Sequence, residues 1–141
     1  MQHGRRRVPS AASPMTTVVD ASAYLDLLLD VVPVEHQGVF DGVLVAPGIF
    51  HAEVASGLAR CERRGVVDPA VADLLLHELV DAPVETVDVR ELLPRAFELR
   101  PNLGVHDACY VALAELLECT LVTSDGRLAR APGLPVPVVL V

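Results

Sequence analysis

Short runs of β-branched and aliphatic residues alternate along this chain with longer segments of helical periodicity. The short runs lie at 16–19, 43–45, 84–89, 120–123 and 138–140. Between them, apolar residues recur at intervals of three and four, which is typical of amphipathic helices. Regular alternation of strands and helices predicts an α/β fold with a central parallel sheet flanked by helices.

Helices are expected over 21–32, 47–64, 69–80, 91–99 and 107–117, with a short helical turn at Asp125. Pro33 should end the first helix, Pro47 should open the second and Gly65 should end it, since these residues are typical of helix boundaries. The apolar stripes on the first and third helices are expected to lie mainly in the core, with some of their residues free to form an exposed docking groove. The stripe of the third helix consists of Val71, Leu74, Leu75 and Leu79.

Composition restricts both the core and the function. At 141 residues the chain is long enough for one domain, and because Trp is absent and aromatic residues are only 4%, its core must consist of Val, Leu and Ala. The net charge of -8 argues against general nucleic-acid binding, although bound divalent cations would cancel part of it. Since the chain has no Lys, a Walker P-loop and a phospho-receiver site are disfavoured.

The N-terminal part of the chain does not resemble a membrane segment. Asp20, Asp26 and Asp30 interrupt its most apolar stretch, and residues 10–14 are not the apolar core of a signal peptide. Residues 1–14 are therefore interpreted as a flexible extension and residues 15–141 as a single domain. Three cysteines without metal-type spacing indicate reduced thiols and a cytoplasmic protein.

Four acidic residues lie where a predicted strand ends or a predicted helix begins: Asp20, Glu53, Asp107 and Asp125. Isolated carboxylates are costly at the edge of a sheet core, and several of them repel each other unless protons or cations neutralise them. Hard cations such as Mg²⁺ or Mn²⁺ are the usual partners of clustered oxygen ligands. The pattern therefore favours metal-dependent phosphodiester chemistry beyond the carboxyl ends of the strands.

Each acid also has a simpler structural explanation. Asp20 can be the N-cap of the first helix, which is worth roughly 1 kcal/mol, and Asp107 can cap its own helix while its other oxygen binds a metal. Asp125 can be a turn residue, and Glu53 can be a solvated helix residue. The presence of all four acids favours a shared site over these separate explanations.

Four motifs carry a resemblance to a known family. They are Val18–Ser22, Ile49–Val54, His106–Glu115 and Leu121–Leu128. In this order they resemble the PIN domain, and most closely the VapC-type toxins of bacterial VapBC toxin–antitoxin pairs. The resemblance extends from about Thr16 to the end of the chain and implies a PIN-like three-layer fold.

The resemblance also implies an activity, that of a Mg²⁺- or Mn²⁺-dependent endoribonuclease that leaves a 3′-hydroxyl and a 5′-phosphate. Catalytic roles are expected for all four acids, with Asp20, Asp107 and Asp125 as metal ligands. Glu53 would orient water or complete the shell of a second ion. No His or Ser nucleophile is then required, because metal ions activate water directly.

Polar residues next to the acids are expected to support them. Ser22, Thr123 and Ser124 can hydrogen-bond to a carboxylate or to metal-bound water, and by resemblance relatives have Ser or Thr near these places. Arg127 and His106 are expected RNA contacts. His106 departs from many relatives, which have an aromatic residue such as Tyr at this position.

The partners implied by the resemblance are a VapB-type antitoxin, a structured RNA such as tRNA or ribosomal RNA, and a second copy in a homodimer. Arg60, Arg63 and Arg64 are either an RNA-facing patch or a solvated helix end. Two other functions stay open, a PIN nuclease in RNA maturation and a PIN scaffold that does not cleave. A haloacid-dehalogenase phosphatase is disfavoured, because Ser22 stands where a second Asp would be required.

Overall fold

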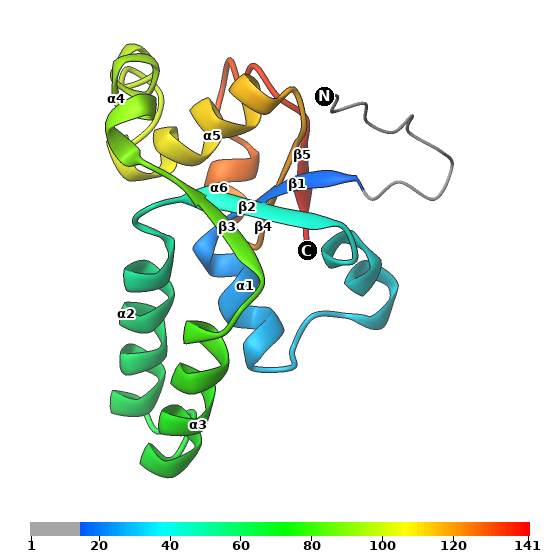
Figure 1. Cartoon of the computed structure of the whole chain (residues 1–141), viewed down its shortest axis with the longest axis vertical. Helices are drawn as coiled ribbons and strands as arrows, with labels where there is room; N and C mark the ends of the chain where they lie inside the picture. Colours follow the sequence, from blue (N-terminus) through cyan, green and yellow to red (C-terminus); the bar gives the residue numbers. More distant parts are fainter. Residues whose placement is uncertain (1–14) are drawn as a thin grey trace, which may run out of the picture.

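The computed structural model describes residues 15–141, whose five strands form one parallel sheet (Figure 1). The strands are β1 (Thr16–Val19), β2 (Val43–Pro47), β3 (Val84–Val87), β4 (Thr120–Thr123) and β5 (Val138–Leu140). Their order across the sheet is β3-β2-β1-β4-β5, and every neighbouring pair is parallel. The predicted parallel sheet is confirmed, with β1 at its centre. The extension proposed for residues 1–14 lies outside the described residues.

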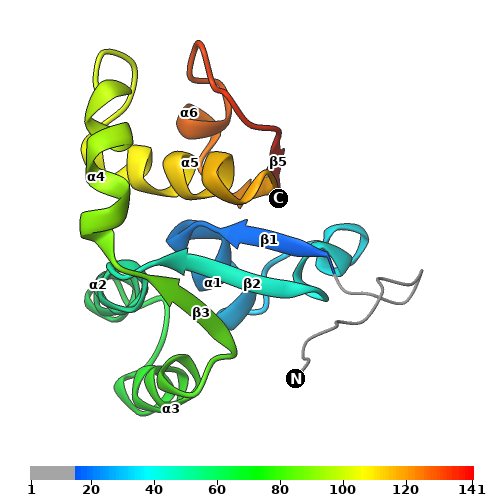
Figure 2. The ribbon, with the colours of Figure 1, turned by 45° about the horizontal axis from the view of Figure 1, so that its top comes forward.

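Helices cover both faces of the sheet. They are α1 (Ala21–Leu28), the 3-10 helix η1 (Val34–Phe40), α2 (Phe50–Arg63), α3 (Pro69–Val80), α4 (Val89–Glu98), α5 (Val105–Leu117) and α6 (Gly126–Ala129). Figure 2 shows α1, α2 and α3 on one side of the sheet and α4, α5 and α6 on the other. The three-layer α/β fold is therefore confirmed. Since parallel crossovers are right-handed, the helices change face where the chain changes direction across the sheet.

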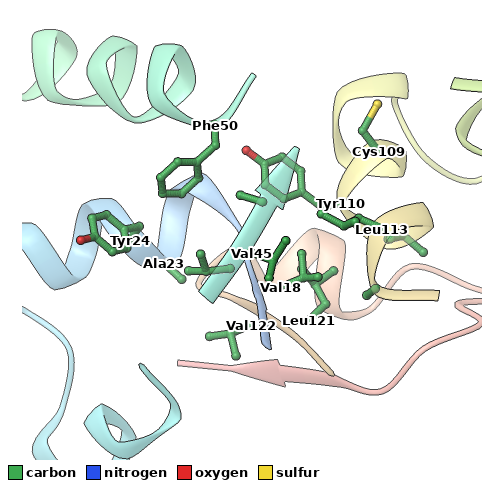
Figure 3. Close-up of a cluster of buried hydrophobic side chains, with 14 of the residues drawn as sticks. Val18, Ala23, Tyr24, Val45, Phe50, Cys109, Tyr110, Leu113, Leu121 and Val122 are labelled. Carbon is green, nitrogen blue, oxygen red and sulfur yellow. The ribbon is translucent and has the colours of Figure 1, made fainter. Parts of the chain in front are cut away.

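The core lies on both faces of β1. Val18 and Val19 are completely buried, and α5 is buried continuously from Ala108 to Ala114 against β1, β2 and β4. Figure 3 shows the aliphatic side chains of the strands packed beneath Tyr110 and Leu113 of α5. A strand covered on both faces has to be apolar along its whole length. This explains why β1 itself contains no charged residue and Asp20 stands just after its end.

The first helix is shorter than the sequence predicted. α1 ends at Leu28 rather than at Val32, and Asp30 adopts a left-handed backbone with φ 58°. Val32 precedes Pro33, and a residue before proline is disfavoured in the helical region. The 3-10 helix η1 that follows was not predicted, because its sequence has no apolar periodicity.

Three other boundaries also differ from the prediction. Pro47 closes β2 instead of opening α2, which begins at Phe50. β3 ends at Val87, and Asp88 caps α4 by accepting a hydrogen bond from the Arg90 backbone N–H. Helix α5 begins at Val105, ahead of Asp107.

The expected inner face of α3 was wrong for two residues. Val71 and Leu74 are 40% and 65% exposed, whereas Leu79 is buried and Leu75 is half-buried. α3 is apolar on most of its circumference, so periodicity alone did not identify the face that packs on α1 and α2. Gly65 adopts φ 75° just after α2, which confirms it as the residue that ends that helix.

No helix within residues 15–141 combines the length and the apolar character that crossing a bilayer requires.

Replacing Leu113 by Ala tests the position of α5 at the centre of the core. Leu113 is fully buried, so we expect Leu113→Ala to lower the free energy of unfolding by about 2–5 kcal/mol. Leu116 on the same helix is 62% exposed, and Leu116→Ala should change it by about 0.5 kcal/mol or less. Urea-induced unfolding measures both, and equal losses would contradict the burial of this face of α5.

Candidate active site at the carboxyl ends of β1 and β4

The four acids converge where the sheet changes direction. β1 pairs with β2 on one side and with β4 on the other, and the connections leaving this point cover opposite faces of the sheet. In open α/β sheets such a point leaves a crevice beyond the carboxyl ends of the strands. Asp20 directly follows β1 and Asp125 follows β4, while α2 contributes Glu53 and α5 contributes Asp107.

All four acids line one cavity of about 280 Å³. A larger cavity of about 430 Å³ lies between η1 and the sheet, but Asp41 is the only ionisable residue among those that line it. Because the four candidate acids meet in the smaller cavity, we take it as the candidate active site and call it the four-acid cavity. Ser22 and Ser124 line it as well.

Two hydroxyl groups hold the Asp20 carboxylate. Ser22 Oγ donates to Asp20 Oδ2 at 2.6 Å, and Thr123 Oγ1 donates to the same oxygen at 2.7 Å. Asp20 is only 6% exposed, and a buried carboxylate is costly without donors. Although Asp20 occupies the N-cap position of α1, its side chain makes no capping hydrogen bond. The simple N-cap explanation therefore does not account for the position of this carboxylate.

The two hydroxyl groups also accept hydrogen bonds from the loop after β4. The backbone N–H of Ser124 donates to Ser22 Oγ at 3.1 Å, and that of Asp125 donates to Thr123 Oγ1 at 3.0 Å. Each hydroxyl has a single proton, already given to Asp20, so the 3.2 Å separation between Ser22 Oγ and Thr123 Oγ1 follows from their shared acceptor. Ser22 and Thr123 thus join the ends of β1 and β4, whereas Ser124 contributes its backbone.

Asp107 carries the clearest sign of repulsion among the acids. Burial raises the pKa of its carboxyl group above the ordinary value, the charges of Asp20 and Asp125 raise it further, Arg127 lowers it and Glu53 raises it. Asp107 is the third residue of α5, whose N-cap is Gly104, so the expectation that Asp107 caps its helix was wrong.

Glu53 has a buried partner that the sequence analysis missed. Tyr110 Oη donates to Glu53 Oε1 at 2.6 Å, and Tyr110 is 1% exposed. Burial, followed by the hydrogen bond to Glu53, raises the pKa of the Tyr110 phenol. A single tyrosine within the apolar stretch of α5 was an available signal, because a buried phenol needs a hydrogen-bond partner.

Asp125 has the turn geometry that its simpler explanation required. Its Oδ1 accepts the backbone N–H of Arg127 at 2.9 Å at the start of α6, and its Oδ2 lies 3.5 Å from Arg127 Nη2. The side chain of Arg127 is otherwise 85% exposed. His106 is exposed and does not line the four-acid cavity.

One cation lines the four-acid cavity itself. Arg60 lies there with Asp26, whereas Arg63 and Arg64 of the same basic group do not. Arg60 Nη1 donates to Ser56 Oγ at 3.3 Å, and Arg60 forms no ion pair within residues 15–141. The periodicity of α2 was the available signal, since Arg60 follows Glu53 by two helical turns.

The acids do not form a ready-made metal shell. Within the part of the chain that the structure describes, no three His, Cys, Asp or Glu side chains are grouped so that they could hold an ion by themselves. The donor set nevertheless consists of carboxylate oxygens, which suit Mg²⁺ or Mn²⁺. Because Mg²⁺ keeps several waters, water and substrate oxygens can complete such a site.

Thr123 offers a test of how Asp20 is held. Thr123→Val keeps the shape but removes the donor to Asp20 and the acceptor for the Asp125 N–H, so it should cost about 1–3 kcal/mol of unfolding free energy. Thr123→Ser keeps the hydroxyl and should cost about 0.8 kcal/mol for one lost methyl group. Urea-induced unfolding in EDTA separates them, and equal losses in the two variants would contradict the hydrogen-bond assignment.

Asp107 should destabilise the metal-free protein at neutral pH. We expect Asp107→Asn to raise the unfolding free energy in EDTA by at most about 1 kcal/mol, because it removes a half-buried charge that the other carboxylates repel and that solvent screens in part. Asp73→Asn, on the exposed side of α3, serves as the control and should change little.

The gain from Asp107→Asn should depend on pH. The folded-state pKa of Asp107 lies above its ordinary value, so protonation at low pH removes the same penalty in the wild type. The difference between wild type and variant is therefore greatest above the raised pKa and shrinks as the pH falls towards the ordinary value. Thermal melts across this range measure it, and a variant less stable than the wild type at neutral pH would count against mutual repulsion.

Comparison with known proteins agrees with this geometry. A PIN domain matches residues 17–134. Ribonuclease VapC3 of Mycobacterium tuberculosis is 39% identical to this chain over 128 residues, which are 89% of this chain and 93% of that protein.

Two solved structures share the fold. PAE2754 from Pyrobaculum aerophilum superposes with a TM-score of 0.64 and 24% identity, covering 92% of both chains. A chain of VapBC2 from Rickettsia felis, solved with a DNA fragment from their promoter, superposes with a TM-score of 0.59 and 16% identity, covering 89% of this chain and 99% of that one. With its match to the PIN model and its identity to VapC3, this chain belongs to the PIN-domain family as a VapC-type member.

Proposed function

We propose that this chain is a Mg²⁺- or Mn²⁺-dependent endoribonuclease that acts as the toxin of a type II toxin–antitoxin pair. Membership among the VapC-type proteins supports RNA as the substrate, since the relative VapC3 is a ribonuclease. The observation that carries the proposal is the convergence of Asp20, Glu53, Asp107 and Asp125 on one cavity at the switch point of the sheet.

The electrostatics of the four-acid cavity favour a cation as ligand. The raised pKa of Asp107 reflects its burial and then the charges of Asp20 and Asp125, which Arg127 offsets only in part. Bound Mg²⁺ or Mn²⁺ would lower the pKa of a coordinated water and stabilise charge on the scissile phosphate. Asp20, Asp107 and Asp125 would hold the ion, and Glu53 would orient the attacking water.

The remaining polar residues divide between positioning and substrate binding. Ser22 and Thr123 fix the Asp20 carboxylate through its Oδ2, and within residues 15–141 its Oδ1 accepts no hydrogen bond. Arg60 lies in the cavity without an ion pair to any described carboxylate, so its guanidinium is suited to hold an RNA phosphate. Arg127 would contact the RNA from the rim, as would His106 from the exposed start of α5.

Two exposed apolar surfaces suit the protein partners that this function requires. Leu74 lines a groove with Tyr24 and Leu28 of α1, where an amphipathic helix of a VapB-type antitoxin would dock. Exposed Leu93 and Phe97 on α4 would contribute to a homodimer. Such a toxin would work in the cytoplasm, where its RNA is found.

The presence of all four acids in one cavity favours cleavage over a scaffold that only binds. A nuclease of RNA maturation would use the same site, so the toxin role depends on selectivity and on an antitoxin. The reading frame next to the gene discriminates these two functions, because a toxin of this kind needs a small antitoxin encoded beside it.

Mapping of RNA ends tests the proposal. The chain is induced in a bacterial host beside Asp107→Asn, and new 5′-phosphate ends are sequenced across total RNA. Wild type should create discrete ends in a few structured RNAs such as tRNA or ribosomal RNA. The variant should lose nearly all of them, because Asp107 would be a ligand of the ion that activates water. Ends produced equally by both proteins would exclude the four-acid cavity as the active site. Absence of new ends with either soluble protein would favour a scaffold. Because a host can lack the target RNA, the purified protein is also incubated with total RNA from the source organism.

A further inference from the structure

We propose that Tyr110 is a positioning residue of this site, whose hydroxyl fixes the Glu53 carboxylate for its role in RNA cleavage. The inference rests on the proposed function and goes beyond it, because it assigns a role to a core residue outside the set of acids. Tyr110 does not line the four-acid cavity, so it would act on the reaction only through Glu53.

The hydrogen bond between Tyr110 and Glu53 is short and shielded. The distance from Tyr110 Oη to Glu53 Oε1 is 2.6 Å, which is typical of a hydroxyl donating to a charged carboxylate. Tyr110 is 1% exposed, and Glu53 is half-buried at the cavity wall. Water therefore competes little for this bond, and the Glu53 side chain loses rotational freedom without losing contact with the cavity.

The phenol lies where the acid-bearing segments meet. Tyr110 follows Asp107 by three residues on α5, so both side chains project from the same face of that helix. One hydroxyl group thus links the first turn of α2 to the first turns of α5.

The ring gives this hydroxyl a rigid base. Figure 3 shows the Tyr110 hydroxyl on the side of the ring that faces Phe50, at the beginning of α2. Phe50 is fully buried and packs edge-on against Tyr24, with ring centroids 5.4 Å apart. Because Phe50 precedes Glu53 by three residues on α2, the aromatic packing and the hydrogen bond restrain the same helical turn. A phenylalanine would fill the core equally well, so the hydroxyl is needed only for its partner.

Tyrosine spectroscopy tests the contact independently of cleavage. The chain has no Trp and only two Tyr, so its tyrosine absorption band comes from Tyr24 and Tyr110 alone. In EDTA, Glu53→Ala should shift the tyrosine band to shorter wavelength, and the same shift should persist with Tyr24→Phe but disappear with Tyr110→Phe. Tyr110→Phe should also lower the melting temperature in the wild type and not in Glu53→Ala. A band that Glu53→Ala does not move, or equal melting losses in both backgrounds, would overturn the link between the two residues.

Steady-state kinetics test the positioning role. The substrate is an RNA oligonucleotide that spans a cleavage site mapped in the host. Tyr110→Phe should lower kcat by about 10-fold or more and leave KM within about twofold, as for residues that orient a metal-site ligand. Thr17→Val, which removes another buried hydroxyl group away from the four-acid cavity, should retain the wild-type kcat. An unchanged kcat in folded Tyr110→Phe would overturn the positioning role. If the wild type itself cleaves no RNA, the proposed function fails, while the spectroscopic result still decides the contact.

Discussion

A buried carboxylate at the end of the central strand constrains the rest of this structure. Asp20 follows Val19 without a spacer and is only 6% exposed, so its desolvation has to be offset by donors. The donors are the hydroxyls of Ser22 and Thr123, which also accept the N–H groups of the loop after β4. The interactions that stabilise Asp20 therefore fix the relative position of β1 and β4, and with it the floor of the four-acid cavity.

Hydrogen bonds stabilise three of the four acids in the four-acid cavity, whereas the charge of the fourth, Asp107, is disfavoured by its surroundings. Asp20, Glu53 and Asp125 each accept hydrogen bonds from the protein, whereas Asp107 has a raised pKa caused by burial and by its acidic neighbours. Function and stability are thus expected to oppose each other at Asp107, as is common at active sites. The proposed cation would reconcile the two, because binding only to the folded state adds stability.

Much of the fold was predictable, because short β-branched and aliphatic runs alternate with segments of helical periodicity. The runs that form β1 and β4 also have an acidic residue at or near their carboxyl ends. The four acids were also identifiable, since each lies at a strand end or an early helical turn. The sequence analysis did not connect Tyr110 with Glu53 or separate Arg60 from its basic group, because a core tyrosine and a surface arginine look ordinary until tertiary packing brings them to Glu53 and the cavity. The prediction of the inner face of α3 was wrong because apolar residues cover most of the circumference of this helix.

Anomalous diffraction from crystals grown with saturating Mn²⁺ is the most direct measurement of the central claim. We expect a peak in the four-acid cavity at about 2.0–2.3 Å from carboxylate oxygens of Asp20 and Asp107, with Asp125 bound directly or through water. The peak should disappear in Asp107→Asn crystals grown under the same conditions. A wild-type cavity without an anomalous peak, with Mn²⁺ bound only elsewhere on the surface, would contradict the metal-dependent mechanism.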